Sequence, residues 1–325
     1  MKSRVLTYFV SALAMVLNAL WAAEAGAQQN FDAVDIHILP VRDNIYMLVG
    51  AGGNITVQVG EQGALIVDTE YAPLADKIMA AIGTLSEGKL RYIINTHYHG
   101  DHVGGNDALR LAGDTITGGN VAGDIGNAGE GAQILAHENV LLRMAAPTGQ
   151  QASSPPGAWP TSTYFNDHKD LYFNGEGIRI LHQPNAHTDG DSLVYFRQSD
   201  VIAAGDIYVT NRYPFIDMAA GGSIQGIIAA VNNIIDLIIP VYGQDGGTLV
   251  IPGHGRLSDI GDVINYREML TIIRDRIQDM IDRGLSLEQV KAAEPSRDYD
   301  ARWGADEGFW TTTQFIEAIY QNLSN

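Results

Sequence analysis

The stretch "INTHYHGDHVGGN", residues 94–106, holds three of the chain's nine histidines and one aspartate within six positions: His97, His99, Asp101 and His102. It continues the apolar run "LRYIINT" (90–96), which reads as a buried strand. We therefore expect the histidine cluster on the loop at the carboxyl end of a strand, where α/β folds place their chemistry. Such a cluster is either a metal site or an accident of a polar loop.

The spacing of these four side chains suits metal binding. In an extended segment His97 and His99 face the same side, so they can hold one ion. Asp101 and His102 follow in a tighter bend and can face a second ion nearby. The chain has no cysteine, so nitrogen and oxygen atoms must hold any metal.

Three further candidates stand at the ends of predicted strands. His187 lies in "NAHTDGDS" just before the strand "SLVYFR". Asp206 ends the apolar strand "VIAAGD", and His254 follows a strand in "IPGHG". The glycines beside His254 let the backbone approach a site closely. A shared site would form where these strand ends meet.

Apolar runs separated by turn residues predict a strand-rich α/β chain. The expected strands are 45–50, 54–60, 64–69, 90–96, 178–183, 192–197, 201–206 and 247–255. The expected helices between them are 72–85 and 224–239, and "GAGG" (50–53) is expected as a hairpin turn or flap. The chain thus looks like two strand-rich halves, each with helices, that form one two-layered core.

Two regions lie outside this pattern. Residues 113–175 are rich in Gly, Pro, Ser and Asn, and a loop of that length is usually a lid or an insertion. Beyond the last expected strand, the amphipathic stretches 264–284 and 312–323 predict helices on the outside. We therefore expect a core domain at 28–257, including that insertion, and a helical extension at 258–325 packed on the same domain.

The N-terminal stretch "MKSRVLTYFVSALAMVLNALWAAEAGAQQ" begins with basic residues, continues with an apolar run to Ala23 and ends in the small residues "AGA" (25–27). This order predicts a secretory signal peptide at 1–27, cut after Ala27, and a periplasmic or secreted protein. An uncleaved anchor helix is the alternative, because Val5 to Ala23 nearly has the length of a membrane span. After cleavage we expect no association with a membrane.

The charge balance bears on partners. The formal net charge is −18, and the chain has no run of Lys or Arg. An acidic chain repels phosphate backbones, so nucleic acid is a poor substrate. We expect a small-molecule substrate and assign the acidity mainly to solubility.

In this order, "THYHGDH", "AHTDGD", "AAGD" and "PGHG" resemble the motifs of the metallo-β-lactamase superfamily over about residues 35–256. The resemblance implies an αββα sandwich of two mixed β-sheets flanked by helices, with a hydrolytic site for one or two metal ions. Carried over position by position, it implies two zinc ions per chain held by His97, His99 and His187, by Asp101, His102 and His254, and by a bridging Asp206. It also implies a catalytic role for Asp101 and attack on a carbonyl by a hydroxide between the metals.

Other residues near the motifs are weaker candidates. Asp68, in "ALIVDT", and Asp191, in "HTDGD", are expected either to orient metal ligands or to cap turns. Tyr98, Tyr208 and Asn211 lie beside ligands and could donate to a developing oxyanion, although tyrosine is also a common packing residue. The remaining histidines are interpreted as exposed or core imidazoles, or as the start of a helix: His37, His168, His182 and, at a helix start, His137.

Export and a two-metal site resemble the antibiotic-degrading enzymes of this superfamily. Those enzymes usually carry Cys or Ser at the position of Asp206, whereas an aspartate there is typical of the wider group, which includes thioesterases and lactonases. The first expected substrate is a β-lactam amide, and the second is a lactone or another ester or thioester. A non-catalytic metal-binding or interaction protein with the same fold is the alternative from another class.

Overall fold

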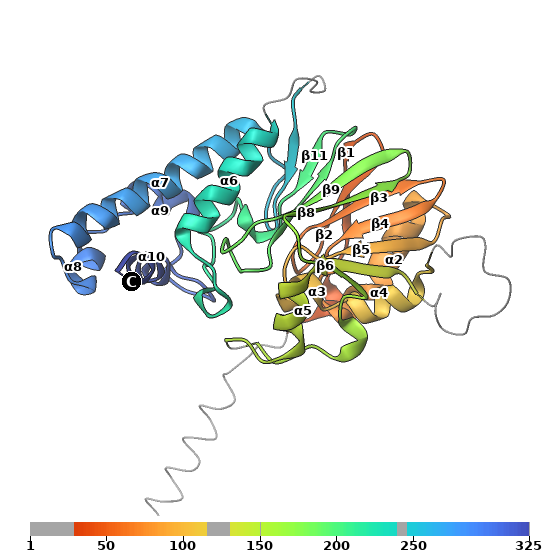
Figure 1. Cartoon of the computed structure of the whole chain (residues 1–325), viewed down its shortest axis with the longest axis horizontal. Helices are drawn as coiled ribbons and strands as arrows, with labels where there is room; N and C mark the ends of the chain where they lie inside the picture. The colour runs from red at the N-terminus through yellow and green to blue at the C-terminus, as the bar shows by residue number, and fades with distance from the viewer. Residues whose placement is uncertain (1–28, 116–130, 150, 239–245, 325) are drawn as a thin grey trace, which may run out of the picture. The chain divides into compact units, whose positions relative to one another are not determined.

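The computed structural model describes residues 29–115, 131–149, 151–238 and 246–324 (Figure 1). The chain divides into one unit at 1–34 and a second at 35–325. In the first unit the described element is the short 3-10 helix η1 (Phe31–Ala33). The predicted signal peptide lies outside the described residues. Among the residues that are described, no helix has the length and apolarity needed to cross a bilayer.

Within 35–325, the described strands of the first sheet number seven, in the order β1-β2-β3-β4-β5-β6-β7. They are β1 (His37–Arg42), β2 (Ile45–Val49), β3 (Ile55–Gly60), β4 (Gly63–Val67), β5 (Leu90–Ile94), β6 (Gln133–His137) and β7 (Ser162–Tyr164). Strands β1 to β4 are antiparallel neighbours, whereas β4 to β7 pair in parallel. Because parallel strands end at the same edge, the loops after β4, β5 and β6 meet there.

The described strands of the second sheet are five, in the order β12-β11-β10-β9-β8. They are β8 (His168–Phe173), β9 (Glu176–His182), β10 (Ser192–Phe196), β11 (Val201–Ala203) and β12 (Leu249–Ile251). Strands β11 and β12 are parallel, and the other pairs are antiparallel. The segments that follow β11 and β12 therefore leave the sheet at one edge.

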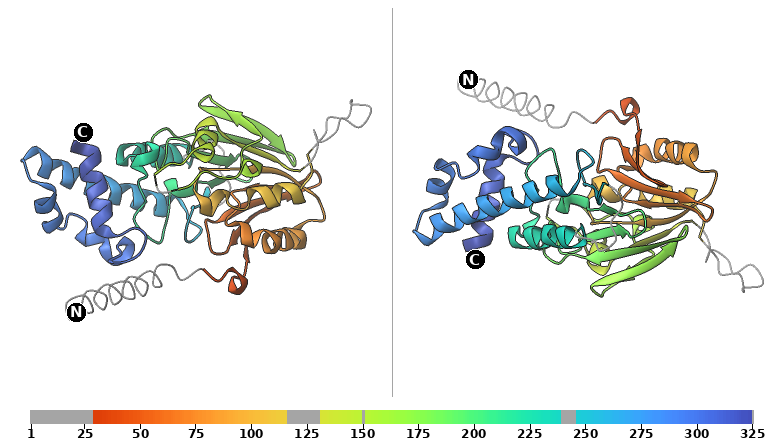
Figure 2. Two further views of the ribbon diagram at one scale, coloured as in Figure 1. Left: turned by 90° about the horizontal axis from the view of Figure 1, so that it is seen from below. Right: turned by 90° about the horizontal axis from the view of Figure 1, so that it is seen from above.

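The two sheets lie face to face (Figures 1 and 2). Alternate side chains of each sheet point inward, so Met47 and Val67 from the first sheet share a buried cluster with Phe173, Val194 and Ile251 from the second. The remaining side chains face outward toward helices. The prediction of an αββα sandwich of two mixed sheets is confirmed.

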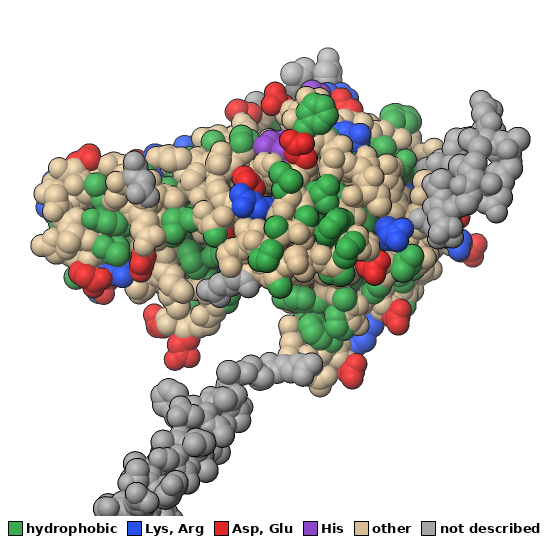
Figure 3. All heavy atoms as spheres, turned by 60° about the horizontal axis from the view of Figure 1, so that its bottom comes forward, with side chains coloured by type: hydrophobic (Ala, Val, Ile, Leu, Met, Phe, Trp, Pro, Cys, Tyr) green, Lys and Arg blue, Asp and Glu red, His purple; other side chains and the backbone are tan. Residues whose placement is uncertain are grey.

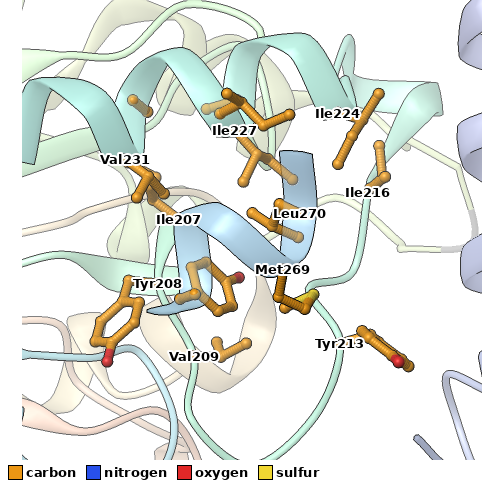
Figure 4. Close-up of a cluster of buried hydrophobic side chains, with 14 of the residues drawn as sticks. Ile207, Tyr208, Val209, Tyr213, Ile216, Ile224, Ile227, Val231, Met269 and Leu270 are labelled. Carbon is orange, nitrogen blue, oxygen red and sulfur yellow. The ribbon is translucent and has the colours of Figure 1, made fainter. Parts of the chain in front are cut away.

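Helices cover the outer faces. The described α-helices are α2 (Ala75–Leu85), α3 (Gly100–Val103), α4 (Asn106–Ala112), α5 (Glu138–Ala145), α6 (Ile224–Ile238), α7 (Ile260–Asp282), α8 (Leu287–Ala292), α9 (Arg297–Trp303) and α10 (Thr312–Ser324). Outward side chains of the second sheet, Ile202 and Val250 among them, share a cluster with Ile227 of α6, Leu270 of α7 and Phe315 of α10. Figure 4 shows Ile227 and Leu270 pointing toward each other in this cluster. Helices α7 and α10 thus share one core with the second sheet.

The described part of 113–175 differs from the expected loop or insertion. It contains β6, α5, β7 and β8, and β6 and β7 extend the first sheet at its parallel end. The apolar runs of these strands are only a few residues long, so the surrounding Gly, Pro and Ser dominate the local composition. Residues 116–130 and 150 of this span lie outside the described residues.

Candidate metal centre

The seven predicted ligand residues stand at the ends of strands from both sheets. His97 and His99 lie on the loop after β5, and His99 is the N-cap of α3, which carries Asp101 and His102. His187 lies in the turn between β9 and β10. Asp206 lies in the short 3-10 helix η5 (Gly205–Ile207) after β11, and His254 follows β12. Seven side chains from distant parts of the sequence are thereby brought to one place.

His97, His99 and His187 form the first group, in which one ring nitrogen of each residue lies within 4.8 Å of the others. His99 Nε2 lies 2.9 Å from Asp217 Oδ2, and His187 Nδ1 lies 2.7 Å from the Phe215 carbonyl. A carboxylate and a carbonyl only accept, so each ring donates its N–H there. The bare nitrogens, His99 Nδ1 and His187 Nε2, then face each other at 2.9 Å.

The third imidazole of this group, that of His97, has one ring nitrogen without a hydrogen-bond partner. His97 Nδ1 lies 3.0 Å from Thr96 Oγ1, whose own proton goes to Asp68 Oδ2 at 2.7 Å. His97 therefore donates from Nδ1, and its Nε2 is buried with no hydrogen-bond partner. Burial and the neighbouring imidazoles hold the pKa of His97 well below its usual value, so the ring is neutral. Three bare lone pairs that converge in a buried place repel one another unless a cation lies between them.

Asp101, His102 and His254 form a second group with the same 4.8 Å limit. His254 Nε2 lies 3.2 Å from Asp101 Oδ2 and 3.3 Å from His102 Nε2. His102 Nδ1 lies 2.8 Å from Asp68 Oδ2, which leaves Nε2 to face the group. Nitrogen and carboxylate oxygen atoms therefore converge here as well.

Asp206 lies between the two groups. Its Oδ1 is 3.2 Å from His102 Nε2 and 3.4 Å from His254 Nε2, and its Oδ2 is 4.0 Å from His187 Nε2. Oδ1 is buried and makes no hydrogen bond with regular geometry. Burial raises the pKa of Asp206, but His254 and His102 outweigh it and hold that pKa well below the usual value. The donor types and the orphaned atoms fit divalent cations, and the His and Asp groups could hold metal.

The two predicted neighbours of the ligands differ: Asp68 contacts a predicted ligand, whereas Asp191 caps a turn. Asp68 is buried and accepts from Thr96 and His102, as above. Asp191 is also buried and accepts from the Thr188 backbone N–H at 2.8 Å and its hydroxyl at 2.7 Å, which fixes the turn that carries His187. Burial raises the pKa of Asp191 to about 8.

The three predicted oxyanion donors lie in different surroundings. Tyr98 is buried and donates to Asp217 Oδ2 at 2.6 Å. Tyr208 is buried in the core beside Tyr266, and its hydroxyl donates to Ser258 Oγ at 2.9 Å rather than to the cluster. Asn211 is exposed on the surface. The packing interpretation therefore applies to Tyr208.

Two residues near the cluster were missed by the sequence analysis. Asp217 accepts from both His99 and Tyr98; burial raises its pKa, but these two hydrogen bonds prevail and lower it to about 2. Arg212 places a guanidinium nitrogen 3.8 Å from Asp206 Oδ2, and its buried Nε has no hydrogen-bond partner. Both residues lie in the irregular segment between η5 and α6, where no strand end marks them.

The cluster is open to solvent on one side. The side chains of His99 and His254 are 14% and 11% exposed, and that of Asp101 is 25% exposed. Figure 3 shows histidine side chains at the surface of one face, beside acidic and basic side chains and near hydrophobic ones. A small molecule can therefore reach the converging nitrogen and oxygen atoms.

The fold and the cluster together define an αββα protein with a site suited to metal ions. A family model described as the metallo-beta-lactamase superfamily matches residues 48–257. That match covers more than half of the chain, and the chain belongs to this superfamily. Members of the superfamily are hydrolases that typically bind metal ions and act on small molecules.

Two curated relatives are similar in sequence. A linear primary-alkylsulfatase from Pseudomonas sp. is 22% identical over 259 residues, 70% of this chain and 47% of its own length. A type 2 metallo-beta-lactamase from Bacillus sp. is 20% identical over 211 residues, 64% of this chain and 69% of its own length. The chain thus spans about half the length of the alkylsulfatase.

Solved structures show the same fold. A stereoselective inverting sec-alkylsulfatase from Pseudomonas sp. has a TM-score of 0.59 at 16% identity, covering 88% of this chain and 50% of its own. A metallo-beta-lactamase from Pontibacter korlensis has a TM-score of 0.55 at 14% identity, covering 73% of this chain and 99% of its own. At these identities the likeness concerns the fold.

Proposed function

We propose that the protein is a zinc-dependent hydrolase with two metal ions per chain. The first ion would be held by His97, His99 and His187, the second by Asp101, His102 and His254, and Asp206 would contact both. The observation that carries this proposal is the set of bare imidazole nitrogens, among them the orphaned Nε2 of His97, fixed by acceptors on the opposite side of each ring. When bound, two zinc ions supply Lewis-acid polarisation and a hydroxide nucleophile at neutral pH.

The chain's own groups would orient the reactants around this centre. Asp101 is the most exposed of the carboxylates in the cluster; burial raises its pKa, but His102 and His254 hold it below the usual range. We assign the Asp101 carboxylate the additional role of accepting a hydrogen bond from the attacking water. The Arg212 side chain lies at the edge of the cluster and is 31% exposed, so its guanidinium would bind an anionic group of the substrate.

We first propose a β-lactam as the substrate. Its strained amide carbonyl would be the group attacked at the metal centre, and Arg212 could bind its carboxylate. The similarity to two metallo-beta-lactamases supports this choice. A lactone or another ester or thioester is the alternative with the same attack on a carbonyl.

A sulfate ester is a second candidate. The sec-alkylsulfatase structure covers 88% of this chain, whereas the metallo-beta-lactamase structure covers 73%. A match over 88% of the chain must include part of the C-terminal helices, and this favours the sulfate ester. A sulfate group would also suit the guanidinium of Arg212.

We also propose that the protein is exported through the signal at residues 1–27 and works in the periplasm or outside the cell. Mass spectrometry of the N-terminus after expression of the full chain tests this. A mature chain that begins at Gln28 in the periplasmic fraction supports export, whereas an intact N-terminus in the cytosol contradicts it.

The activity is tested with the zinc-loaded protein on β-lactams, lactones, thioesters and alkyl sulfates. We expect two zinc ions per chain and turnover of at least one class, with activity lost in His99→Ala and Asp101→Ala. Turnover of sulfate esters alone would replace the β-lactam proposal with the second candidate. Absence of bound metal from the folded chain would contradict the metal centre itself.

A further inference from the structure

A pocket of about 680 Å³ adjoins the metal centre. His99 and Asp217 line one part of it, so the pocket begins at the proposed ligands. Its walls come from the segment that precedes α6 and from the C-terminal segment around α10: Phe215, Met218, Phe309, Trp310 and Ala318. The volume lies in the range of pockets that bind small organic molecules.

An aromatic wall connects the ligands to the C-terminal segment. The Phe215 ring lies 5.7 Å from the rings of both His99 and His187, measured between centroids. On its other side Phe215 contacts Phe309 at 5.0 Å and Trp310 at 4.8 Å, both nearly edge to face. The Trp310 Nε1 donates to the Pro214 carbonyl at 3.0 Å, which fixes the indole. The apolar surface is therefore continuous from the metal ligands to residue 310.

The pocket is extended along α10. Gln314, Ala318 and Gln321 line it at intervals of four and three residues, which places them on one face of the helix. Seven residues of α-helix rise by about 10 Å. Glu317 lines the same part of the pocket, so Ala318 is the apolar member of the α10 wall, and most of the apolar surface comes from Phe215, Phe309 and Trp310.

Two large apolar side chains at the pocket are exposed. Phe309 is 74% exposed and Met218 is 39% exposed. Exposed apolar groups that gather beside a polar site commonly mark a place where a ligand is bound.

We propose that this pocket binds an aliphatic chain of the substrate, whose reacting group lies at the metal centre. This inference rests on the proposed function, and among the proposed substrates it favours an open-chain ester, such as the sulfate ester, over the β-lactam. The reacting group would lie near the zinc ligands and Arg212, and the chain would run past Phe215 toward α10. The substrate class is then a small anionic compound with a straight apolar chain.

The first test uses straight-chain alkyl carboxylates from two to twelve carbons as ligands of the full chain supplied with zinc. Isothermal titration calorimetry below the aggregation limit of each compound gives the dissociation constants. We expect each added methylene to tighten binding about fourfold, the equivalent of ~0.8 kcal/mol, until the pocket is filled. An affinity that does not depend on chain length overturns the inference.

The second test compares matched variants. Phe309→Ser removes an exposed aromatic side chain at the pocket, whereas Phe165→Ser removes one of similar exposure, 71%, that does not line it. We expect Phe309→Ser to weaken binding of the ten-carbon carboxylate about tenfold and Phe165→Ser to leave it unchanged. Gln321→Trp adds bulk at one end of the α10 wall and should shorten the chain length at which the gain stops. Equal effects of both serine variants, or an unchanged limit in Gln321→Trp, overturn the inference.

These tests separate the pocket from the reaction. Chain-length-dependent binding without hydrolysis of any compound supports the pocket and contradicts the proposed function. Hydrolysis with rates and affinities independent of chain length supports the proposed function and contradicts the pocket.

Discussion

Asp217 is the residue whose substitution tests how His99 is held. Its Oδ2 accepts from His99 Nε2 at 2.9 Å and from Tyr98 at 2.6 Å. Asp217→Asn removes the charge but keeps the shape, so His99 loses its charged acceptor and its Nδ1 becomes a weaker ligand. We expect zinc affinity to fall about 10- to 100-fold. Competition with a chromophoric chelator measures the change.

The control for this prediction is Asp236→Asn, because Asp236 is exposed on α6 and does not belong to the cluster. It makes the same change of charge without touching His99. Wild-type zinc affinity in Asp217→Asn would contradict the orienting role, and a loss shared by both variants would point to net charge instead.

His137 gives a prediction about pH. It is the N-cap of α5, accepts from the Asn139 N–H, and stacks on His182 with ring centroids 3.6 Å apart. Burial and then the charge of His182 lower the pKa of His137 to about 4, although Asp189 opposes this. The unfolded chain binds a proton at its ordinary pKa of 6.5, well before the folded protein does. The neutral ring therefore loses its contribution to stability as the pH falls from about 6.5 to about 4.

His137→Asn keeps an N-cap acceptor and removes the titrating ring. We expect the free energy of unfolding of the wild type to fall by up to about 2 kcal/mol more than that of the variant between pH 7 and pH 5. Urea unfolding at the two pH values measures this difference. Losses of stability that both proteins share, such as the loss caused by metal release, cancel in the comparison. Parallel pH dependence of the two proteins would show that His137 titrates normally.

At this same scale, sequence reasoning could bring the seven predicted ligands together because each stands at a strand end. The same reasoning could not find Asp217 or Arg212. Their segment has neither the alternation of a strand nor a metal-ligand spacing, and its place is set by contacts such as the Trp303 carbonyl accepting from the Tyr213 N–H at 2.9 Å. Side chains placed by tertiary contacts alone leave no local pattern.

At the scale of elements, the turn between β2 and β3 packs directly against the residues of the predicted metal cluster. The Gly53 N–H donates to the Asp101 carbonyl at 3.0 Å, and a Cβ on Gly53 would overlap the His102 imidazole. We expect Gly53→Ala to displace His102 and to reduce zinc content and activity at least tenfold. Metal analysis of the purified variant, together with its thermal unfolding, checks this outcome.

Gly83→Ala is the matched control, because Gly83 is exposed within α2 and an added Cβ would meet no atom within 4 Å. Alanine favours the helix, so we expect this variant to gain up to about 1 kcal/mol of stability with unchanged zinc content. Full zinc content in Gly53→Ala would show that the turn can move away from His102.

The elements found from the sequence are those with long or alternating apolar runs. Strands β2 to β5 and β9 to β12 and helices α2, α6, α7 and α10 correspond to expected elements. Strand β1 has no alternation, because most of "HILPVR" is exposed or half-buried. Strand β7 has three residues, and its parallel pairing with β6 supplies order that its own sequence does not. Strands β1 and β7, which depend on their neighbours, are therefore among the elements that were missed.

At the scale of the molecule, the predicted ligands come from loops that follow strands of both sheets. His97 and His99 follow a strand of the first sheet, whereas His187, Asp206 and His254 follow strands of the second. Ions shared between these loops would stabilise the packing of one sheet on the other. They would also relieve the repulsion between bare nitrogens and between the carboxylates of Asp101 and Asp206.

Removal of metal should therefore destabilise the whole sandwich and not one loop. Free zinc at 100 times its dissociation constant stabilises a folded protein by about 2.7 kcal/mol per site. We expect a strong chelator to lower the melting temperature by several degrees, to speed hydrogen exchange in the loops after β5, β11 and β12 together, and to be reversed by added zinc. The double variant His97→Ala/His254→Ala, with one ligand lost from each group, should respond little to the chelator. A melting temperature that does not change with chelator, or exchange that quickens after β5 alone, would mean that the ions do not couple the sheets.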